Sequence, residues 1–152
     1  MEFKLKAFQE LSVNELYAIL QLRSEVFVVE QNCPYQDLDG KDHEALHLMG
    51  FDETGLIAYA RLLKPGMSYK EAAIGRVVVA PGKRGKNSGR ELMIQAIEQC
   101  SNAFGTDTII ISAQQYLEKF YSSLGFVTES NVYLEDDIPH IKMRWVRSGN
   151  TI

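Results

Sequence analysis

Two histidines and a glutamate stand close together in the stretch HEALH, residues 43–47. The stretch fits H-E-x-x-H, which on a helix places two zinc ligands on one face beside a glutamate base. That geometry requires a helix, because residues i and i+4 must project together. The apolar residues that follow fit a strand instead, where His43 and His47 would lie about 13 Å apart. We therefore expect no metal site, and a zinc hydrolase is the weakest of the functions considered.

A loop rich in glycine and basic residues, PGKRGKNSG (residues 81–89), suggests that the protein binds an anion. The loop lies between an apolar, β-branched segment and a strongly periodic helical segment. A helix N-terminus attracts anions through its free N–H groups and the positive end of its dipole, and glycines let the main chain approach a ligand. We expect a phosphate or pyrophosphate here, with a solvated basic turn as the alternative.

Two better-known phosphate loops do not match this stretch. In a Walker loop a glycine would stand at Ala80, and Lys86 would be followed by Ser or Thr rather than Asn87. The dinucleotide pattern G-x-G-x-x-G is also missing from the sequence.

The elements that must position these residues follow from hydrophobic periodicity. Alternation predicts a strand over residues 3–8, and Ser12 with Glu15 forms a capping box that opens a helix. Residues 46–51 and 56–63 read as a hairpin. Residues 73–80 predict a central buried strand. The periodic run over residues 92–104 predicts an amphipathic helix.

The C-terminal third predicts a further strand, a helix and two more strands. Residues 107–112 read as a buried strand, and Ser112 with Gln115 as a second capping box. Gly125 would end the helix that follows. Strands are expected near residues 126–132 and 140–146. The order β-α-loop-β-β-β-α-β-α-β-β predicts one α/β domain, residues 1–152, with a mixed sheet and helices on both faces.

Composition narrows the functional classes. The net charge of -4 implies no general attraction to nucleic acid or to an anionic membrane surface. The two cysteines form no C-x-x-C pair. The N-terminal residues lack the apolar core of a signal peptide, and the longest apolar runs are too short to cross a bilayer. We expect a soluble cytoplasmic protein.

Several segments together resemble the GNAT superfamily of N-acetyltransferases. RGKNSG (residues 84–89) is similar to its pyrophosphate loop Q/R-x-x-G-x-G/A, and IGRVVVAP (residues 74–81) to its fourth strand. QQYLEKFYSSLGF (residues 114–126) resembles its N-x-x-A-x-x-F-Y-x-x-x-G-F signature. EVFVVEQNCPYQDLDGKD and EDDIPHIKMRW further resemble the small bacterial ElaA-like branch. The resemblance covers nearly the whole chain and implies a mixed, mostly antiparallel sheet of about seven strands.

The sequence departs from the family pattern at three positions. Asn87 replaces the central glycine of the loop, and asparagine tolerates the left-handed region better than most residues. Gln114 stands where many members carry Asn, and Leu117 where many carry Ala. These departures bear on details of cofactor contact and not on the fold.

The resemblance implies acetyl-CoA as cosubstrate, without a metal. Its pyrophosphate would rest on main-chain N–H groups of the loop, and its pantetheine arm would run beside the fourth strand. The N–H of Val78 or Val79 would polarise the thioester carbonyl. The implied contacts are Val77, Val78, Val79, Arg84, Gly85, Lys86, Asn87, Ser88, Gly89 and Gln114.

The implied reaction is direct attack of a primary amine on the thioester, which needs a base and an acid. Tyr121 matches the family tyrosine that protonates the leaving thiolate; a core aromatic is the alternative. The base is left open between Glu30, Glu44, His47 and a water relay. Glu30 follows an apolar run, so partial burial would raise its pKa. His47 would point into the cleft, or be a hydrogen-bonded structural residue.

Two residues are candidates for contact with the acceptor. Arg76 interrupts a buried strand, so it must pair with an acid or line a cleft, where it would bind a substrate carboxylate. His140 would border the acceptor pocket or be an ordinary strand histidine. The acceptor would be a small molecule or peptide, and a homodimer is left open. The rival functions are a CoA-binding sensor without turnover and a ping-pong enzyme using Cys33.

Overall fold

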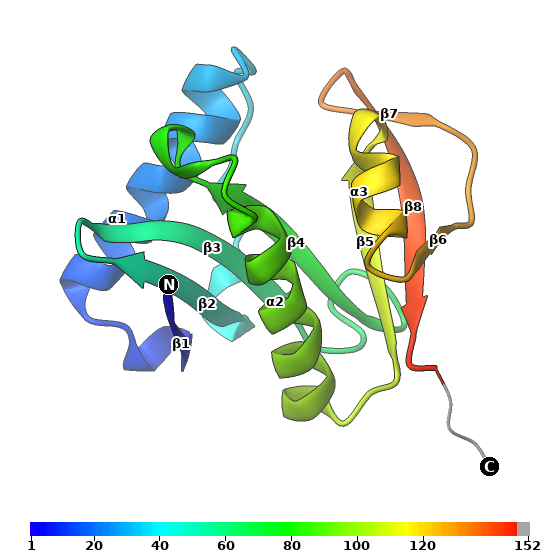
Figure 1. Cartoon of the computed structure of the whole chain (residues 1–152), viewed down its shortest axis with the longest axis horizontal. Coiled ribbons are helices and arrows are strands. Elements are labelled where there is room, and N and C mark those ends of the chain that lie inside the picture. Colours follow the sequence, from blue (N-terminus) through cyan, green and yellow to red (C-terminus); the bar gives the residue numbers. More distant parts are fainter. Residues whose placement is uncertain (149–152) are drawn as a thin grey trace.

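A single twisted sheet of eight strands forms the centre of the computed structural model, which describes residues 1–148 (Figure 1). The strand order is β1-β2-β3-β4-β5-β8-β6, and β7 pairs with the far end of β8. The strands are β1 (Glu2–Ala7), β2 (Leu46–Asp52), β3 (Gly55–Leu63), β4 (Ala72–Val79), β5 (Thr108–Gln114), β6 (Phe126–Thr128), β7 (Tyr133–Glu135) and β8 (Ile138–Val146). The helices are α1 (Val13–Arg23), α2 (Ser88–Phe104) and α3 (Glu118–Ser122).

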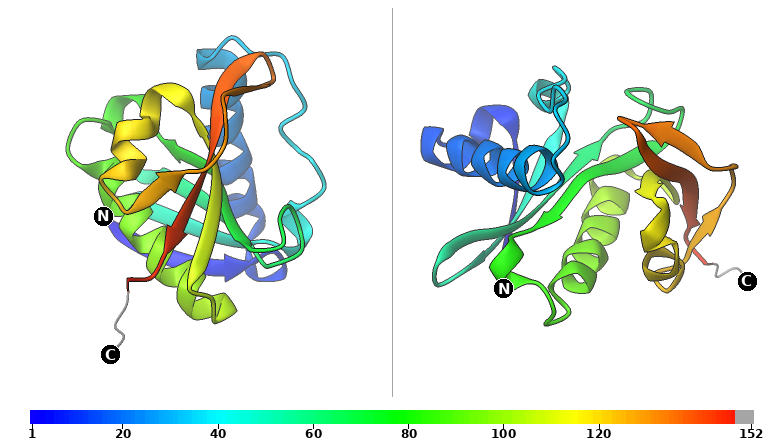
Figure 2. Two further views of the ribbon diagram at one scale, coloured as in Figure 1. Left: turned by 90° about the vertical axis from the view of Figure 1, so that its right-hand side faces the viewer. Right: turned by 90° about the horizontal axis from the view of Figure 1, so that it is seen from above.

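The helices cover both faces of the sheet, as the sequence predicts (Figure 2). Helix α1 packs one face, where Ile19 and Leu22 bury against Tyr59 and Val78. Helices α2 and α3 cover the other face in the larger apolar cluster, to which Leu92, Met93 and Tyr121 belong. The apolar stripe of α2 therefore determines which side of the sheet it occupies. Among residues 1–148, no helix has the length and apolar character needed to span a membrane.

Strands β4 and β5 pair over a very short distance and then separate. They are the parallel neighbours in the described sheet, and only Ala72 with Ile109 and Ala73 with Ile110 are in register. A register shift in the β3–β4 pairing places two residues of β4 opposite one of β3. Arg76 at this bulge has a φ of +49°. Bulges bend the strand that carries them, so β4 turns away from β5 and the two strands diverge (Figure 1).

Most predicted elements are confirmed, with small differences at their ends. Ser12 and Glu15 form the expected capping box, with the Glu15 N–H donating to Ser12 Oγ at 3.0 Å and the Ser12 N–H to Glu15 Oε1 at 2.8 Å. Gly125 takes a φ of +101°, but α3 ends at Ser122 with Ser123 as its C-cap, so Gly125 lies one residue beyond the predicted C′ position.

Two predictions about the C-terminal third are wrong. The second capping box does not form, because β5 continues through Ser112 to Gln114 and the Ser112 hydroxyl instead bonds Tyr133 and Glu135. The expected strand over residues 126–132 is two strands. β6 ends at Thr128, and β7 resumes at Tyr133 to pair with the opposite end of β8. The polar residues Glu129, Ser130 and Asn131 stand at this break, but the sequence does not show that the two segments pair with opposite ends of β8.

Candidate active site

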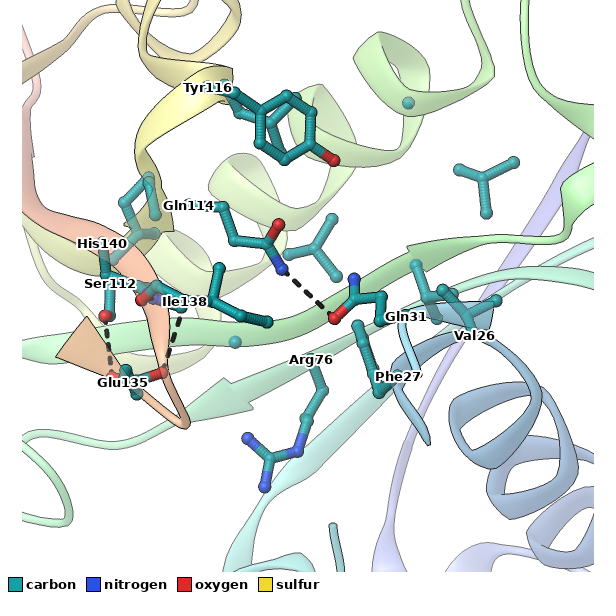
Figure 3. Close-up of a pocket in the computed structure, with 18 of the residues that line it drawn as sticks. Val26, Phe27, Gln31, Arg76, Ser112, Gln114, Tyr116, Glu135, Ile138 and His140 are labelled. Carbon is teal, nitrogen blue, oxygen red and sulfur yellow. Dashed lines mark hydrogen bonds and ion pairs between the residues drawn. The ribbon is translucent and has the colours of Figure 1, made fainter. Parts of the chain in front are cut away.

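A cleft of about 690 Å³ opens where β4 and β5 diverge. One wall is the edge of β4 from Ile74 to Val79, and the other is β5 from Ile111 to Gln114. The remaining sides come from the chain after α1, the loop before α2, helix α3 and the turn between β7 and β8. Figure 3 shows side chains from the chain after α1, from β4 and β5, and from β7 and β8 around the cleft. Segments distant in sequence therefore meet at the point where the sheet opens.

The exposed main chain of β4 provides hydrogen-bonding groups along the cleft. The Ala80 N–H donates to the Ile57 carbonyl of β3 at 2.8 Å. Main-chain groups alternate in direction along an antiparallel pair, so Val78 also faces β3 and Val79 faces the cleft. The Val79 carbonyl indeed accepts from Arg84 Nε at 3.0 Å. Of the two valines expected to polarise a carbonyl, the main-chain direction therefore favours Val79 over Val78.

The basic loop leads directly into the N-terminus of α2 at one end of the cleft. Arg84, Gly85 and Gly89 line the cleft, whereas Lys86, Asn87 and Ser88 do not. Gly85 has a φ of +90°, and a Cβ added there would meet no atom within 4 Å. Asn87 precedes α2 with a φ of +60°. The prediction that asparagine accommodates the left-handed conformation is thus confirmed. The loop leaves space for a phosphate group beside free helix N–H groups.

Glu30 is not the desolvated carboxylate that the sequence predicts. The Arg84 guanidinium binds it through two hydrogen bonds of 2.7 and 2.8 Å. This pairing lowers the pKa of Glu30 from its ordinary value, which is opposite to the expected direction. The apolar run before Glu30 does not bury it, because residues Ser24–Glu30 form a π-helical extension of α1 that ends with Glu30 at the surface.

Tyr121 lies on α3 with its side chain at the cleft and 7% of its surface exposed. Phe120 and Phe126 pack edge-on against its ring, with centroids at 5.1 and 5.9 Å. Burial raises the pKa of the Tyr121 hydroxyl to about 12. The phenol is therefore protonated at neutral pH. Tyr121 therefore combines the two alternatives that the sequence offered: its ring packs in the core, and its side chain also lines the cleft.

His47 does not face the cleft, so the prediction of its orientation is wrong. It is 1% exposed on β2, and both ring nitrogens are engaged. Nε2 lies 2.9 Å from the Asp42 carbonyl, which can only accept, so Nδ1 accepts from the Tyr59 hydroxyl at 2.6 Å. Burial lowers the pKa of His47. This histidine is a structural residue of the sheet, as the alternative interpretation held.

The remainder of HEALH lies apart from the cleft as well. His43 and Glu44 belong to a short 3-10 helix, Asp42–Glu44, and strand β2 begins at Leu46. Glu44 is exposed and pairs with Lys64 at 3.4 Å. The stretch does not form the continuous helix that a zinc motif requires.

Arg76 belongs to a buried cluster of three arginines and three aspartates. Its Nε lies 2.7 Å from Asp37 Oδ1. Arg23, with no exposed surface, contacts Asp37 at 2.9 Å and Asp42 at 2.8 Å. Arg61 completes the cluster with Asp42 at 3.0 Å and Asp39 at 2.8 Å. Arg76 lines the cleft, yet aspartates already neutralise its guanidinium, so its position does not support binding of a substrate carboxylate.

This cluster fixes the irregular segment between the π-helical turn and β2. The three aspartates Asp37, Asp39 and Asp42 lie in that segment, and the arginines project from α1, β3 and β4. The segment also supplies Cys33 and Tyr35 to the cleft. Six ion pairs among these side chains thus hold a polar stretch that is irregular up to the short 3-10 helix Asp42–Glu44.

The sequence analysis missed several residues that line the cleft. Gln31 reaches from the end of the π-helical turn toward Gln114, with 3.5 Å between their amide groups (Figure 3). Ser112, Glu135 and Asp136 lie on the opposite side, near His140. Glu135 accepts from Ser112 Oγ at 3.0 Å. Only the polar run EDD before β8 distinguishes these acids in the sequence, and their direction depends on the turn.

The divergence of two parallel strands around an open cleft matches the fold that the GNAT resemblance implies, and comparison with known proteins agrees. A family model described as "Acetyltransferase (GNAT) domain" matches residues 8–147. The chain belongs to the GNAT acetyltransferase family. It is 47% identical to the protein ElaA of Escherichia coli K12 over 136 residues, 88% of this chain and 89% of that protein. The ElaA-like resemblance is therefore confirmed.

Solved structures show the same fold. An acyl-CoA N-acyltransferase from Pseudomonas aeruginosa superimposes with a TM-score of 0.89 and 43% identity, covering 96% of this chain and all of that one. An aminoglycoside 6'-N-acetyltransferase complexed with coenzyme A gives a TM-score of 0.70 with 16% identity, covering the full length of both chains. At that identity the second likeness concerns the fold alone.

Proposed function

We propose that this protein is an N-acetyltransferase that transfers an acetyl group from acetyl-CoA to the primary amine of a small molecule or peptide. The separation of β4 from β5 carries the proposal. It leaves the cleft-facing edge of β4 without a neighbouring strand. An extended arm can hydrogen-bond there as an additional strand would, beside the Val79 carbonyl that Arg84 occupies. Membership of the GNAT family and a fold shared with a protein that was crystallised with coenzyme A support this reading.

The loop before α2 supplies the anion-binding end of the proposed cosubstrate site. Arg84, Gly85 and Gly89 line it, and the N–H groups of the first turn of α2 point toward the same end. Arg84 is held by Glu30 and Val79, so its guanidinium is already oriented. Lys86, Asn87 and Ser88 would contribute through main chain and charge rather than by lining the cleft.

The acid in the proposed reaction is Tyr121. A buried phenol that remains protonated up to a pKa of about 12 can donate a proton to a thiolate that leaves beside it. The N–H of Val79 would stabilise the negative charge that develops on the thioester oxygen. The chain thus offers a donor for each centre where negative charge forms.

The proposal is tested by measuring thiol release from acetyl-CoA with a panel of primary amines: a diamine, an aminoglycoside, a free amino acid and a short lysine peptide. Binding is measured separately, as the shift of the thermal unfolding midpoint by coenzyme A. We expect both a shift and turnover of at least one amine class. A thermal shift without any turnover would support the CoA-binding sensor instead, and the absence of both would refute the assignment.

A further inference from the structure

The histidine at the cleft is His140, near the N-terminal end of β8. It lies opposite Gln114 of β5 in the sheet register. The residue is 7% exposed, and it lines the cleft beside Ser112 and Ile138 (Figure 3). A buried imidazole on a rigid strand, open to a cleft, has the placement that a proton acceptor needs.

The hydrogen bonds of His140 determine which nitrogen carries the proton. Nδ1 lies 2.7 Å from the carbonyl oxygen of Ile138. A carbonyl only accepts hydrogen bonds, so Nδ1 must be the protonated nitrogen. The neutral ring therefore has its lone pair on Nε2. The ring of Tyr133 stacks on His140 at 6.2 Å with an interplanar angle of 24°, which holds the ring plane.

The surroundings of Nε2 favour acceptance of a positive charge. The nearest charged group is Glu135 of β7, with Oε2 at 3.6 Å from Nε2. Glu135 is itself held by the Ser112 hydroxyl. Asp136 from the β7–β8 turn also lines the cleft, and the hydroxyls of Tyr133 and Tyr69 lie near Ser112 and Glu135. Two further ionisable groups lie at this end: the Lys142 ammonium, which is 5.3 Å from the Tyr69 ring and pairs with Glu129 at 3.3 Å, and the Cys33 thiol, 3.6 Å from the Asp136 carbonyl. The groups closest to Nε2 are therefore the carboxylate of Glu135 and the Tyr133 ring.

We infer that His140 is the general base of the acetyl transfer, acting through Nε2, and that Glu135 is a positioning residue for the imidazolium that forms. The inference rests on the proposed function and names the base that the sequence leaves open. It differs from the expected role of His140 as a border of the acceptor pocket. The same carboxylates would attract an acceptor that arrives as an ammonium ion.

The proton and electron balance is complete without another reactant. His140 Nε2 takes one proton from the acceptor ammonium, whose freed lone pair forms the C–N bond with the thioester carbonyl carbon. Tyr121 protonates the sulfur as the C–S bond breaks. The second proton leaving the nitrogen restores the Tyr121 hydroxyl, and His140 releases its proton to solvent. The net products are an amide, a free thiol and one proton.

The first test is His140→Asn, whose side-chain amide can still donate to the Ile138 carbonyl but has no basic nitrogen. With acetyl-CoA and the amine of the panel that gives the highest rate, we expect kcat/KM to fall by about 10² to 10³-fold. The limb of the pH profile that falls toward low pH should also disappear. Coenzyme A should raise the unfolding midpoint as in the wild type. His43→Asn, at an exposed histidine away from the cleft, is the matched control and should leave kcat/KM unchanged.

The second test is chemical rescue in His140→Ala. Added imidazole should restore a part of kcat/KM that increases with imidazole concentration, as it replaces the lost base. A purely structural role would not respond in this way. Retention of kcat/KM within about threefold in His140→Asn, or no rescue in a folded His140→Ala variant, would overturn the inference.

The third test needs neither an acceptor nor a folded variant. Nitrogen-15 NMR of the wild-type protein, with its three labelled histidines, reports which ring nitrogen carries the proton. We expect Nδ1 of His140 to carry a proton, because it faces the Ile138 carbonyl at 2.7 Å. A proton on Nε2 of the neutral ring would overturn the inference, even if the amine panel gives no turnover. Failure of the panel with the expected tautomer would instead count against the proposed transferase function.

Discussion

Replacement of Asp42 by Asn tests whether the buried arginine–aspartate cluster holds the wall of the cleft. The Asp42 carboxylate contacts Arg23 at 2.8 Å and Arg61 at 3.0 Å, and Arg23 has no exposed surface. Removing one partner of a buried ion pair typically costs about 3 to 5 kcal/mol, since the other charge remains buried. Arg23 keeps Asp37 and Arg61 keeps Asp39, so we expect the low end, about 3 kcal/mol.

The assay is urea unfolding at pH 7, checked by thermal unfolding. For a domain of this length, 3 kcal/mol corresponds to a midpoint lower by about 6 to 12 °C. The matched control is Asp107→Asn, which removes an exposed pair with Arg147 at 3.3 Å and should change stability by less than about 1 kcal/mol. A loss below about 1 kcal/mol in Asp42→Asn would refute the reasoning, because the two variants would then be equivalent.

Three further predictions concern acidity, the reaction and the anion loop. Burial opposes ionisation of Asp42, but the hydrogen bonds of Arg23 and Arg61 prevail and lower its pKa. The stability that this carboxylate contributes is present above its unfolded pKa of about 3.9 and is lost as the pH falls through the lower folded value. The stability difference between wild type and Asp42→Asn should shrink in urea titrations between about pH 5 and pH 2, and a constant difference would contradict this. Tyr121→Phe should lower kcat about 10²-fold while coenzyme A still raises the unfolding midpoint; full kcat would exclude the acid role. Asn87→Ala should reduce the free energy of unfolding by about 1 kcal/mol because Ala is strained at positive φ, whereas Asn87→Gly should not, and equal stabilities would show that the strain argument fails.

The sequence determined the parts of this protein that depend on local patterns. The 3.6-residue period of residues 92–104 predicts α2, and the β-branched run before Ala80 predicts β4. Glycines and basic residues between these elements indicate the anion-binding end of the site. The conformation of Asn87 also follows from local preference. These features require only neighbouring residues, so a linear reading finds them.

The ionisation and orientation of single side chains depend on segments that lie far away in the sequence. Glu30 is paired because Arg84 reaches it across 54 positions of sequence. His47 is enclosed because Tyr59 and Asp42 occupy both its ring nitrogens. These partners cannot be assigned from hydrophobic periodicity. Periodicity indicates which face of an element is apolar, but it does not indicate which polar groups contact one another. For that reason the predicted direction of the Glu30 pKa shift and the predicted orientation of His47 were both wrong.

The cleft itself is a product of tertiary structure. The sequence identifies β4 and β5 as buried strands, but it does not show that a bulge at Arg76 separates them after two paired residues. Nor does it show that β7 returns Glu135 to His140, because the pairing of β7 with the opposite end of β8 joins segments that local patterns do not connect. By itself, the chain determined the family, the elements and the cofactor loop. The register of the strands decided which main-chain groups stay free and which histidine faces the cleft, because both depend on pairings between residues far apart in the chain.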